Sequence, residues 1–287
     1  MSVNGTKMVA IAAHNYIYTS NDSGVTWTRR TSTGRNWLPA ASSSDGSTLM
    51  AGEYGGYIYT SNDSGVTWTQ RNKVGFAYWQ STVISSDGTK MAAAPQGGYI
   101  HTSNDSGVTW TQQNGSASRQ WNGLAMSANG TKMAAGVGGA SSAGGYIYTS
   151  NDSGVTWTAQ KNSTIQNWYS VASSSDGAKL VAVPSGGYIY TSNDSGVTWT
   201  EQTNSTIQNW WFVASSSDGT KLVAVVNGGY IYTSNDSGVT WTKQNNSPNR
   251  VWQVVASSGD GTTLVAGVHP GYVYTSYDSG VTWTQRI

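Results

Sequence analysis

Short runs of apolar and β-branched residues, separated by polar turns, recur along the whole chain about every 42 residues. The most regular run is Tyr57-Ile-Tyr-Thr-Ser-Asn-Asp-Ser-Gly-Val-Thr-Trp-Thr69. Its first five residues are typical of a strand, and Val-Thr-Trp-Thr resumes one. The Asn-Asp-Ser-Gly between them favours a turn. The run therefore predicts a β-hairpin.

Three residues give this hairpin its expected geometry. Gly65 can take the positive φ that a tight loop needs, and the Asp63 carboxylate can accept hydrogen bonds from backbone N–H groups of the loop. Trp68 is large and rigid enough to anchor the returning strand in a core.

Seven copies of this hairpin make the chain an array of one unit. Their final Trp residues stand at 27, 68, 110, 157, 199, 241 and 283, in steps of 41, 42, 47, 42, 42 and 42 residues. In the unit at 210–243, strands are predicted at 210–216, 220–226, 230–234 and 239–243. Turn residues separate the first three of them, at 217–219 and 227–229. Four antiparallel strands in such a repeat are typical of one propeller blade.

The pattern Ser-x-Asp-x-Gly-x-Thr-Trp resembles the Asp box, or BNR repeat, of sialidase-like β-propellers. The resemblance covers the whole chain and implies an all-β, seven-bladed β-propeller, with about four antiparallel strands per blade, as a single domain over 1–287. Asp boxes in that family are structural hairpins of enzymes, receptors and assembly factors alike, so they leave the function open.

The first blade is expected to lack its innermost strand. The turn before the second strand occurs seven times, at Asn4, Asp45, Asp87, Asn129, Asp176, Asp218 and Asp260, whereas a Trp-led first strand occurs six times. Either this blade has three strands or a segment outside the printed chain completes it. Another unit is five residues longer between Met133 and Tyr146, which indicates a surface insertion or a lip beside a binding site.

Composition narrows the partners more than the compartment. Charged residues are 10% of the chain and the net charge is +1, which gives no electrostatic case for nucleic acid or an anionic membrane. The absence of cysteine excludes disulfides and thiolate metal sites. We interpret the apolar run at 8–13 as a strand rather than a signal peptide, and no run is long enough for membrane insertion. The composition favours a secreted or cell-surface monomer without fixing the localisation.

The family layout assigns the acidic residues to one side of the ring. In that layout the turns between the first and second strands and between the third and fourth strands lie on one face, which we call the box face. The turns between the second and third strands, and the links between blades, lie on the opposite, ligand-binding face, which we call the link face. Every Asp then falls on the box face, in the turns above or in the structural boxes at Asp22, Asp63, Asp105, Asp152, Asp194, Asp236 and Asp278.

The remaining acids, Glu53 and Glu201, lie three blades apart, whereas glycosidases generally need two carboxyls within roughly 5–9.5 Å. The sialidase variant of that chemistry uses Tyr as nucleophile, but it still needs an acid and an arginine triad, and the family's Arg-Ile-Pro signature is missing. We therefore expect no enzyme activity and no catalytic residues.

No cofactor or metal is expected. The three histidines, His14, His101 and His269, fall in different blades, and His101 replaces the second Tyr of Tyr-Ile-Tyr, which indicates packing. One carboxylate per box loop is a poor ligand set for Ca²⁺.

The candidate ligand residues gather where the variable links enter the first strands. Aromatic faces beside amides and guanidinium groups suit sugar rings, whereas the same Trp rings can also fill the wedge between blades as core. Both roles stay open for the six first-strand Trp, and the three Arg that stand two positions before some of them can attract an anion. The set is Arg35, Trp37, Trp79, Arg119, Trp121, Trp168, Trp210, Arg250 and Trp252.

Together these patterns predict a non-catalytic binding or scaffold module, with glycan recognition through the link face as its most concrete form. The alternative partner is another protein, in an assembly scaffold resembling photosystem II assembly factors. A designed or recently amplified propeller without an evolved ligand also fits the near-identical boxes. A sialidase-type glycoside hydrolase is the third hypothesis.

Overall fold

A computed structural model of the protein describes residues 1–287 except 12–15, 32, 139–143 and 287. Within those ranges the chain is built from short antiparallel strands that fall into seven consecutive groups. The first group has three strands, β1 (Met8–Ile11), β2 (Ile17–Ser20) and β3 (Thr28–Arg29).

Each later group has four strands, paired in the order in which they follow along the chain. The second and third groups are β4 (Trp37–Ser42), β5 (Leu49–Gly56), β6 (Ile58–Ser61) and β7 (Thr69–Arg71), then β8 (Ala77–Ile84), β9 (Met91–Gly98), β10 (His101–Ser103) and β11 (Thr111–Gln112). The fourth and fifth are β12 (Arg119–Met126), β13 (Met133–Val137), β14 (Ile147–Ser150) and β15 (Thr158–Gln160), then β16 (Trp168–Ser173), β17 (Leu180–Gly187), β18 (Ile189–Ser192) and β19 (Thr200–Gln202). The sixth and seventh are β20 (Gln208–Ser215), β21 (Leu222–Gly229), β22 (Ile231–Ser234) and β23 (Thr242–Lys243), then β24 (Arg250–Ser257), β25 (Leu264–Val268), β26 (Val273–Ser276) and β27 (Thr284–Gln285).

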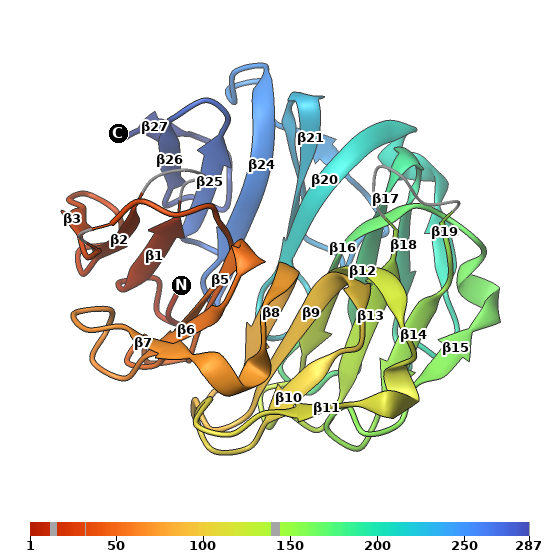
Figure 1. The fold of residues 1–287 in the computed structure, drawn as a ribbon. Helices are drawn as coiled ribbons and strands as arrows, with labels where there is room; N and C mark the ends of the chain where they lie inside the picture. The colour runs from red at the N-terminus through yellow and green to blue at the C-terminus, as the bar shows by residue number, and fades with distance from the viewer. Residues whose placement is uncertain (12–15, 32, 139–143, 287) are drawn as a thin grey trace.

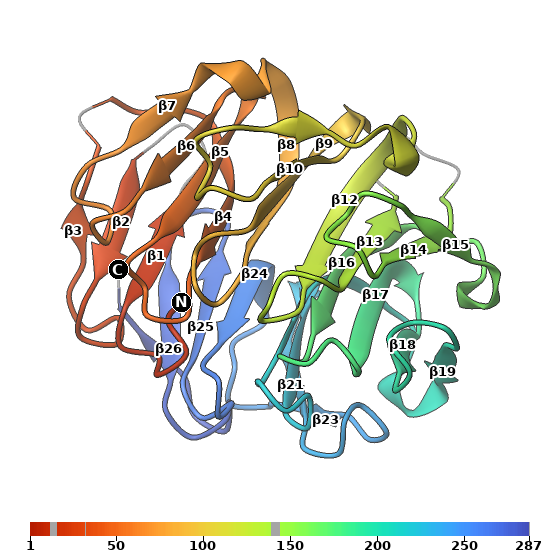
Figure 2. The ribbon, with the colours of Figure 1, turned by 90° about the horizontal axis from the view of Figure 1, so that it is seen from below.

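The groups follow one another around a common centre, so that the first lies beside the last. Figures 1 and 2 both show β1 and β2 next to β25 and β26. Second strands such as β5 extend past their own group and pair with the first strand of the next, where Tyr54 lies opposite Tyr78. Four short 3-10 helices occupy links in the described chain, at Asn72–Val74, Asn114–Ser116, Lys161–Ser163 and Thr203–Ser205.

A closed circle of backbone hydrogen bonds joins the seven turns that precede the second strands. In each turn one N–H donates to a carbonyl of the next turn, over N···O distances of 2.6–3.1 Å. The circle runs from Val3 to Ser44, Ser86, Ala128, Ser175, Ser217 and Gly259, and Gly259 N–H donates back to Val3 O. The first group is therefore held to the seventh by the same bond that joins every other pair.

The core lies in the joints between neighbouring groups. At one joint Val181, Val183 and Ile189 of the fifth group pack against Trp210 and Val213 of the sixth, all buried. This arrangement follows from the pattern of the strands, whose two faces both meet a neighbour and are therefore both apolar.

The structure departs from the predicted strands in two ways. The fourth strand of the 210–243 unit was predicted over 239–243 but comprises only Thr242–Lys243, because Val239 lies in the box loop and is exposed. The second strand was predicted to end at 226 but runs on to Gly229, where it pairs with β24. The three-stranded first group agrees with the missing innermost strand. His14 and most of the predicted insertion lie outside the described residues.

Candidate functional site

Each box hairpin is locked by its own side chains. In the second copy, Asp63 Oδ1 accepts from the Thr67 N–H at 2.9 Å and from the Ser61 hydroxyl at 2.8 Å, while Oδ2 accepts from the Thr67 hydroxyl at 2.6 Å. Trp68 Nε1 donates to Gly65 O at 3.0 Å. Gly65 has the predicted positive φ, 85°.

Ser64 also has a positive φ, 58°, which the sequence analysis missed. Left-handed conformations are uncommon for Ser, so the residue type gave no signal there. The box is thus a self-contained hydrogen-bonded loop, and its carboxylate is occupied by its own backbone and hydroxyl groups.

These bonds predict an acid-sensitive fold. The Thr67 hydroxyl, followed by its N–H, holds the pKa of Asp63 at about 2, below its ordinary 3.8, and Thr26 does the same for Asp22. A carboxyl whose pKa is lowered on folding stabilises the protein at any pH above its pKa in the unfolded chain. This stabilisation is lost as the pH falls toward its pKa in the folded protein. We expect the melting temperature to be flat above about pH 5 and to fall between about pH 4 and pH 2. A melting temperature unchanged down to pH 2 would contradict this origin of stability.

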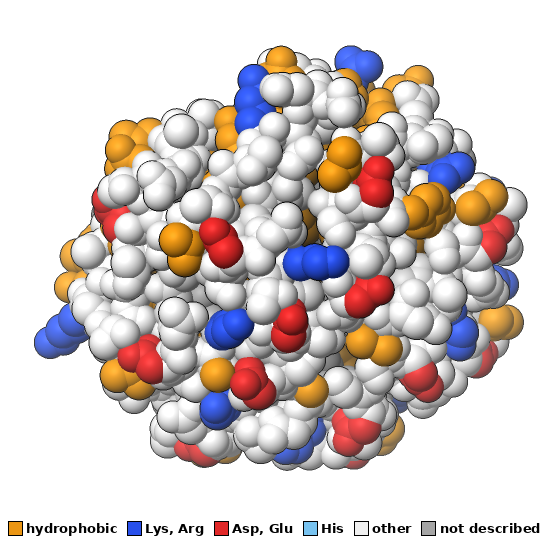
Figure 3. All heavy atoms as spheres, turned by 180° about the vertical axis from the view of Figure 1, so that it is seen from behind, with side chains coloured by type: hydrophobic (Ala, Val, Ile, Leu, Met, Phe, Trp, Pro, Cys, Tyr) orange, Lys and Arg blue, Asp and Glu red, His pale blue; other side chains and the backbone are white. Residues whose placement is uncertain are grey.

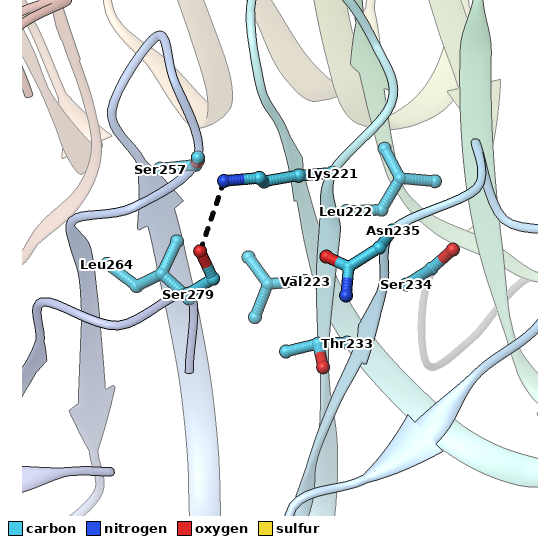
Figure 4. A pocket seen from close by; sticks show the side chains of 10 residues that line it. Lys221, Leu222, Val223, Thr233, Ser234, Asn235, Ser257, Leu264 and Ser279 are labelled. Carbon is cyan, nitrogen blue, oxygen red and sulfur yellow. Dashed lines mark hydrogen bonds between the residues drawn. The ribbon is translucent and has the colours of Figure 1, made fainter. Parts of the chain in front are cut away.

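On the box face, side-chain hydrogen bonds join neighbouring groups. Lys221 Nζ of the sixth group donates to the Ser279 hydroxyl in the seventh box at 3.3 Å (Figure 4). The hollow beside this bond measures only about 10 Å³, roughly the room of one water. Equivalent Lys-to-Ser bonds link Lys7 to Ser64, Lys90 to Ser153, Lys132 to Ser195 and Lys179 to Ser237. Box loops and first-to-second turns therefore share one face, as the family layout implied.

The turn and box carboxylates differ in how replaceable they are. Asn129 Oδ1 accepts from Ser127 and Thr131 much as Asp176 Oδ1 accepts from Ser174 and Ala178. A box Asp instead uses both oxygens as acceptors.

We expect Asp194→Ala to lower the free energy of unfolding by about 1–3 kcal/mol, through the lost bonds from Thr198 and Ser192. The control Asp176→Asn should change it by less than about 0.5 kcal/mol, because that turn uses one carboxylate oxygen and Asn129 fills the same position with an amide oxygen. Denaturant titration measures both variants. Equal costs for the two would contradict the assigned roles. Neither variant should alter ligand affinity, since both lie on the box face.

The six predicted Trp are buried, with at most 2% of each residue exposed. Their faces are covered by neighbouring groups, and Tyr of the third strand meets the ring edge, as Tyr232 does Trp210 at 5.0 Å. Four of them donate Nε1–H to a glycine carbonyl of the preceding group, at Gly56, Gly98, Gly145 and Gly187. The stacking role proposed for Trp37, Trp79, Trp121, Trp168, Trp210 and Trp252 is corrected accordingly, because no ring presents a free face, and their burial fits the core alternative.

The three predicted Arg lie in separate groups and are not brought together by short contacts. Arg35 Nη1 lies 3.2 Å from Glu53 Oε2, and its guanidinium lies over the Tyr59 ring at 5.2 Å. Arg119 lies over Tyr148 at 4.5 Å. Arg250 begins β24 and is exposed. Arg250 is thus the most accessible of the three, and anion binding by them stays a prediction.

The other titratable candidates also have packing partners. Glu53 pairs with Arg35. Glu201 lies three groups further on and accepts a hydrogen bond from the Tyr190 hydroxyl of its own group. His101 meets Trp79 edge-on at 5.4 Å, and burial lowers the pKa of its imidazole. His269 lies after β25, in a different group.

An aromatic patch that the sequence analysis missed lies at the link end of the second and third groups. It consists of Tyr54, Tyr57, Phe76 and Tyr78, with successive ring centroids 5.1–6.3 Å apart. Phe76 is 62% exposed and Tyr78 is 52% exposed, and the Tyr54 hydroxyl donates to Gln96 Oε1 at 2.7 Å. Phe76 breaks the repeat, since Ile165 and Ile207 hold its place in later links. That departure was the available signal.

The described residues show few arrangements of charged or metal-binding side chains. Figure 3 shows acidic and basic side chains scattered singly over one face, without a block of either sign. Among the described residues there is no group of three His, Cys, Asp or Glu placed to hold a metal ion. No helix in the described ranges is long and apolar enough to cross a membrane.

Comparison with known proteins establishes the fold class. No protein-family model matches the chain, and no curated protein does. A solved structure of YCF48 bound to D1 peptide aligns over 96% of this chain and 91% of its own, with 16% identity and a TM-score of 0.74. The Myceliophteria thermophila Cps50 (Swd1) β-propeller domain aligns over 94% and 91%, with 11% identity and a TM-score of 0.72.

The Niastella koreensis GH74 enzyme aligns over 99% of this chain but 55% of its own, with 18% identity and a TM-score of 0.54. At such identities the likeness is one of fold alone. The chain is thus an all-β protein of the propeller type, similar to the YCF48 and GH74 propellers, and the fold class predicted from the repeats is confirmed at that level.

Proposed function

We propose that the seven strand groups are seven blades of one closed Asp-box propeller, and that this propeller is a non-catalytic scaffold that binds a segment of another protein. The observation that carries the proposal is the likeness to YCF48, a structure described as bound to D1 peptide. It favours the protein-assembly alternative of the sequence analysis over glycan recognition. The circle of seven turn-to-turn bonds supports the blade count.

The aromatic patch is the proposed contact for that segment. Interfaces are rich in Tyr and Phe, and the residues that contribute most to binding are often aromatic. Phe76 and Tyr78 are each more than half exposed, while Tyr54 and Gln96 offer a polar edge for a peptide backbone. The exposed Arg250 elsewhere on the link end adds one positive group.

A random peptide library displayed on phage tests this function. We expect enrichment of a binding sequence whose affinity falls at least tenfold in a Phe76→Ser, Tyr78→Ser variant. The matched control is Val197→Ser, an equally exposed apolar residue in a box loop, which should bind as the parent does. Failure to enrich any sequence, or binding indifferent to the patch, would overturn the proposal.

Glycan binding is the second candidate, because exposed Phe76 and Tyr78 rings also suit stacking on sugars. A glycan array with the same variants decides between the two. Glycan binding lost in the patch variant, together with an empty peptide selection, would replace the protein ligand with a sugar.

Hydrolysis is not expected. Glu53 is ion-paired and Glu201 lies three groups away, so neither has the partner carboxyl of a glycosidase. Fluorogenic aryl glycosides and sialosides should show no turnover above buffer. Turnover that disappears on Glu53→Gln or Glu201→Gln would establish an enzyme instead.

A further inference from the structure

The joint between the seventh and first groups lacks a component that the other joints contain. Between the fifth and sixth groups, Trp210 and Val213 of a first strand fill the space between Val181, Val183 and Ile189 on one side and Ala224 and Tyr232 on the other. At the seventh-to-first joint the equivalent walls are Val265, Gly267 and Val273 of the seventh group and Ala10 and Tyr18 of the first.

Those walls are more exposed than their equivalents. Val183, Ile189 and Ala224 are fully buried and Val181 is 1% exposed, whereas each of the five residues at the seventh-to-first joint is partly exposed. Hence the walls that a first strand and its Trp cover elsewhere are only partly covered here.

The strand that borders this space has a free edge. Among the described residues β1 pairs with β2 alone, whereas β17 pairs with both β16 and β18. Successive first strands pack against each other from β4 to β24, but β24 and β4 do not pack in that way. An unpaired strand edge is a template for another strand.

We propose that this joint is a strand-acceptor site, which binds an extended peptide of another chain antiparallel to β1. The occupied joints define the chemistry of that peptide as Trp-x-x-Val-Ala-Ser, the pattern of β16, since these side chains fill the same walls. The register follows from β16 and β17, where Val171, Ala172 and Ser173 lie opposite Ala182, Val181 and Leu180. The peptide's Val, Ala and Ser would therefore face Ala10, Val9 and Met8.

Such binding is β-strand addition, in which main-chain hydrogen bonds supply affinity and side-chain pockets supply specificity. The Trp of the peptide enters beside Tyr18, as Trp168 lies edge-on to Tyr190 at 5.1 Å. The site is separate from the aromatic patch, so it stands whether or not the patch binds a partner.

A synthetic, fluorescently labelled peptide with the sequence of Gln166–Ser174 is the probe. We expect saturable binding with a Kd below about 1 mM, and at least tenfold weaker binding when its Trp is replaced by Ala. In the protein, Ala10→Phe fills the open space and should also weaken binding at least tenfold. Val281→Phe, a change of similar size at an exposed box position, should not.

Hydrogen exchange provides a readout that does not depend on the variant folding. Bound peptide should slow exchange of the Val9 and Ile11 amides and leave those of β17 unchanged. No saturable binding up to millimolar peptide, or binding that ignores both the Trp and Ala10→Phe, would overturn the proposal. A concentration-dependent dimer that Ala10→Phe disrupts would overturn it in favour of a second copy of this chain.

Discussion

The Trp210→Ala variant is expected to lose about 3–5 kcal/mol of unfolding free energy. The ring is fully buried at a joint between two groups, where it contacts Val181, Val183 and the edge of Tyr232. Removing the ring leaves a cavity between the fifth and sixth groups. It also deprives the Gly187 carbonyl of its Nε1–H donor. The cost therefore combines lost burial, a void and an unpaired acceptor.

Guanidinium titration of Trp210→Ala beside Val239→Ala measures this effect. Val239 is an exposed apolar residue in the box of the same group, and its replacement should cost less than about 0.5 kcal/mol. Trp210→Phe should fall between the two, since it keeps most of the volume but not the Nε1–H. A loss below about 1 kcal/mol for Trp210→Ala would show that the joint relaxes to close the cavity.

A first strand added to the first group is expected to raise the melting temperature by several degrees. The turn residue Ser2 corresponds to Ser174, so a segment copied from Gln166–Ala172 and placed directly before Met1 keeps the spacing of the repeat. The added strand would pair with β1 and bury Ala10 and Tyr18. A gain of about 1 kcal/mol moves the melting temperature of a protein near this size by about 2–4 °C.

The matched control replaces the last added residue, copied from Ala172, by Pro, because its N–H faces β1 and Pro removes that ladder donor. It should melt at the temperature of the parent chain. In the parent, the amides of β1 should exchange faster than those of β17, because the first group has an unpaired edge. Equal exchange in β1 and β17, or an equal gain from the Pro control, would contradict this account.

The sequence predicted the repeated elements well because each is set by local chemistry. The Asp63 carboxylate and the positive φ of Gly65 follow from short-range hydrogen bonding and from the lack of a Cβ. The three-stranded first group followed from counting Trp residues against turns.

What the sequence could not give depends on contacts between units. Trp168 reads equally as platform or core until its neighbours are placed, and burial assigns it to the core. The aromatic patch needed the pairing of β5 with β8, which brings Tyr54 and Tyr78 together from different repeats. The shortened fourth strands arise because the box loop retains Val239 rather than pairing it.

The circle of turn bonds makes the covalent order of the repeats largely irrelevant to the assembled ring. Every turn donates in the same sense, including Gly259 to Val3, where no peptide linkage connects the two groups. The ring is thus closed at the seventh-to-first joint by the same backbone hydrogen bond that joins its other groups. A chain permuted to start in another link should close the same circle, because every turn makes the same backbone bond. Such interchangeability is the condition under which an array can grow by duplication of a single unit.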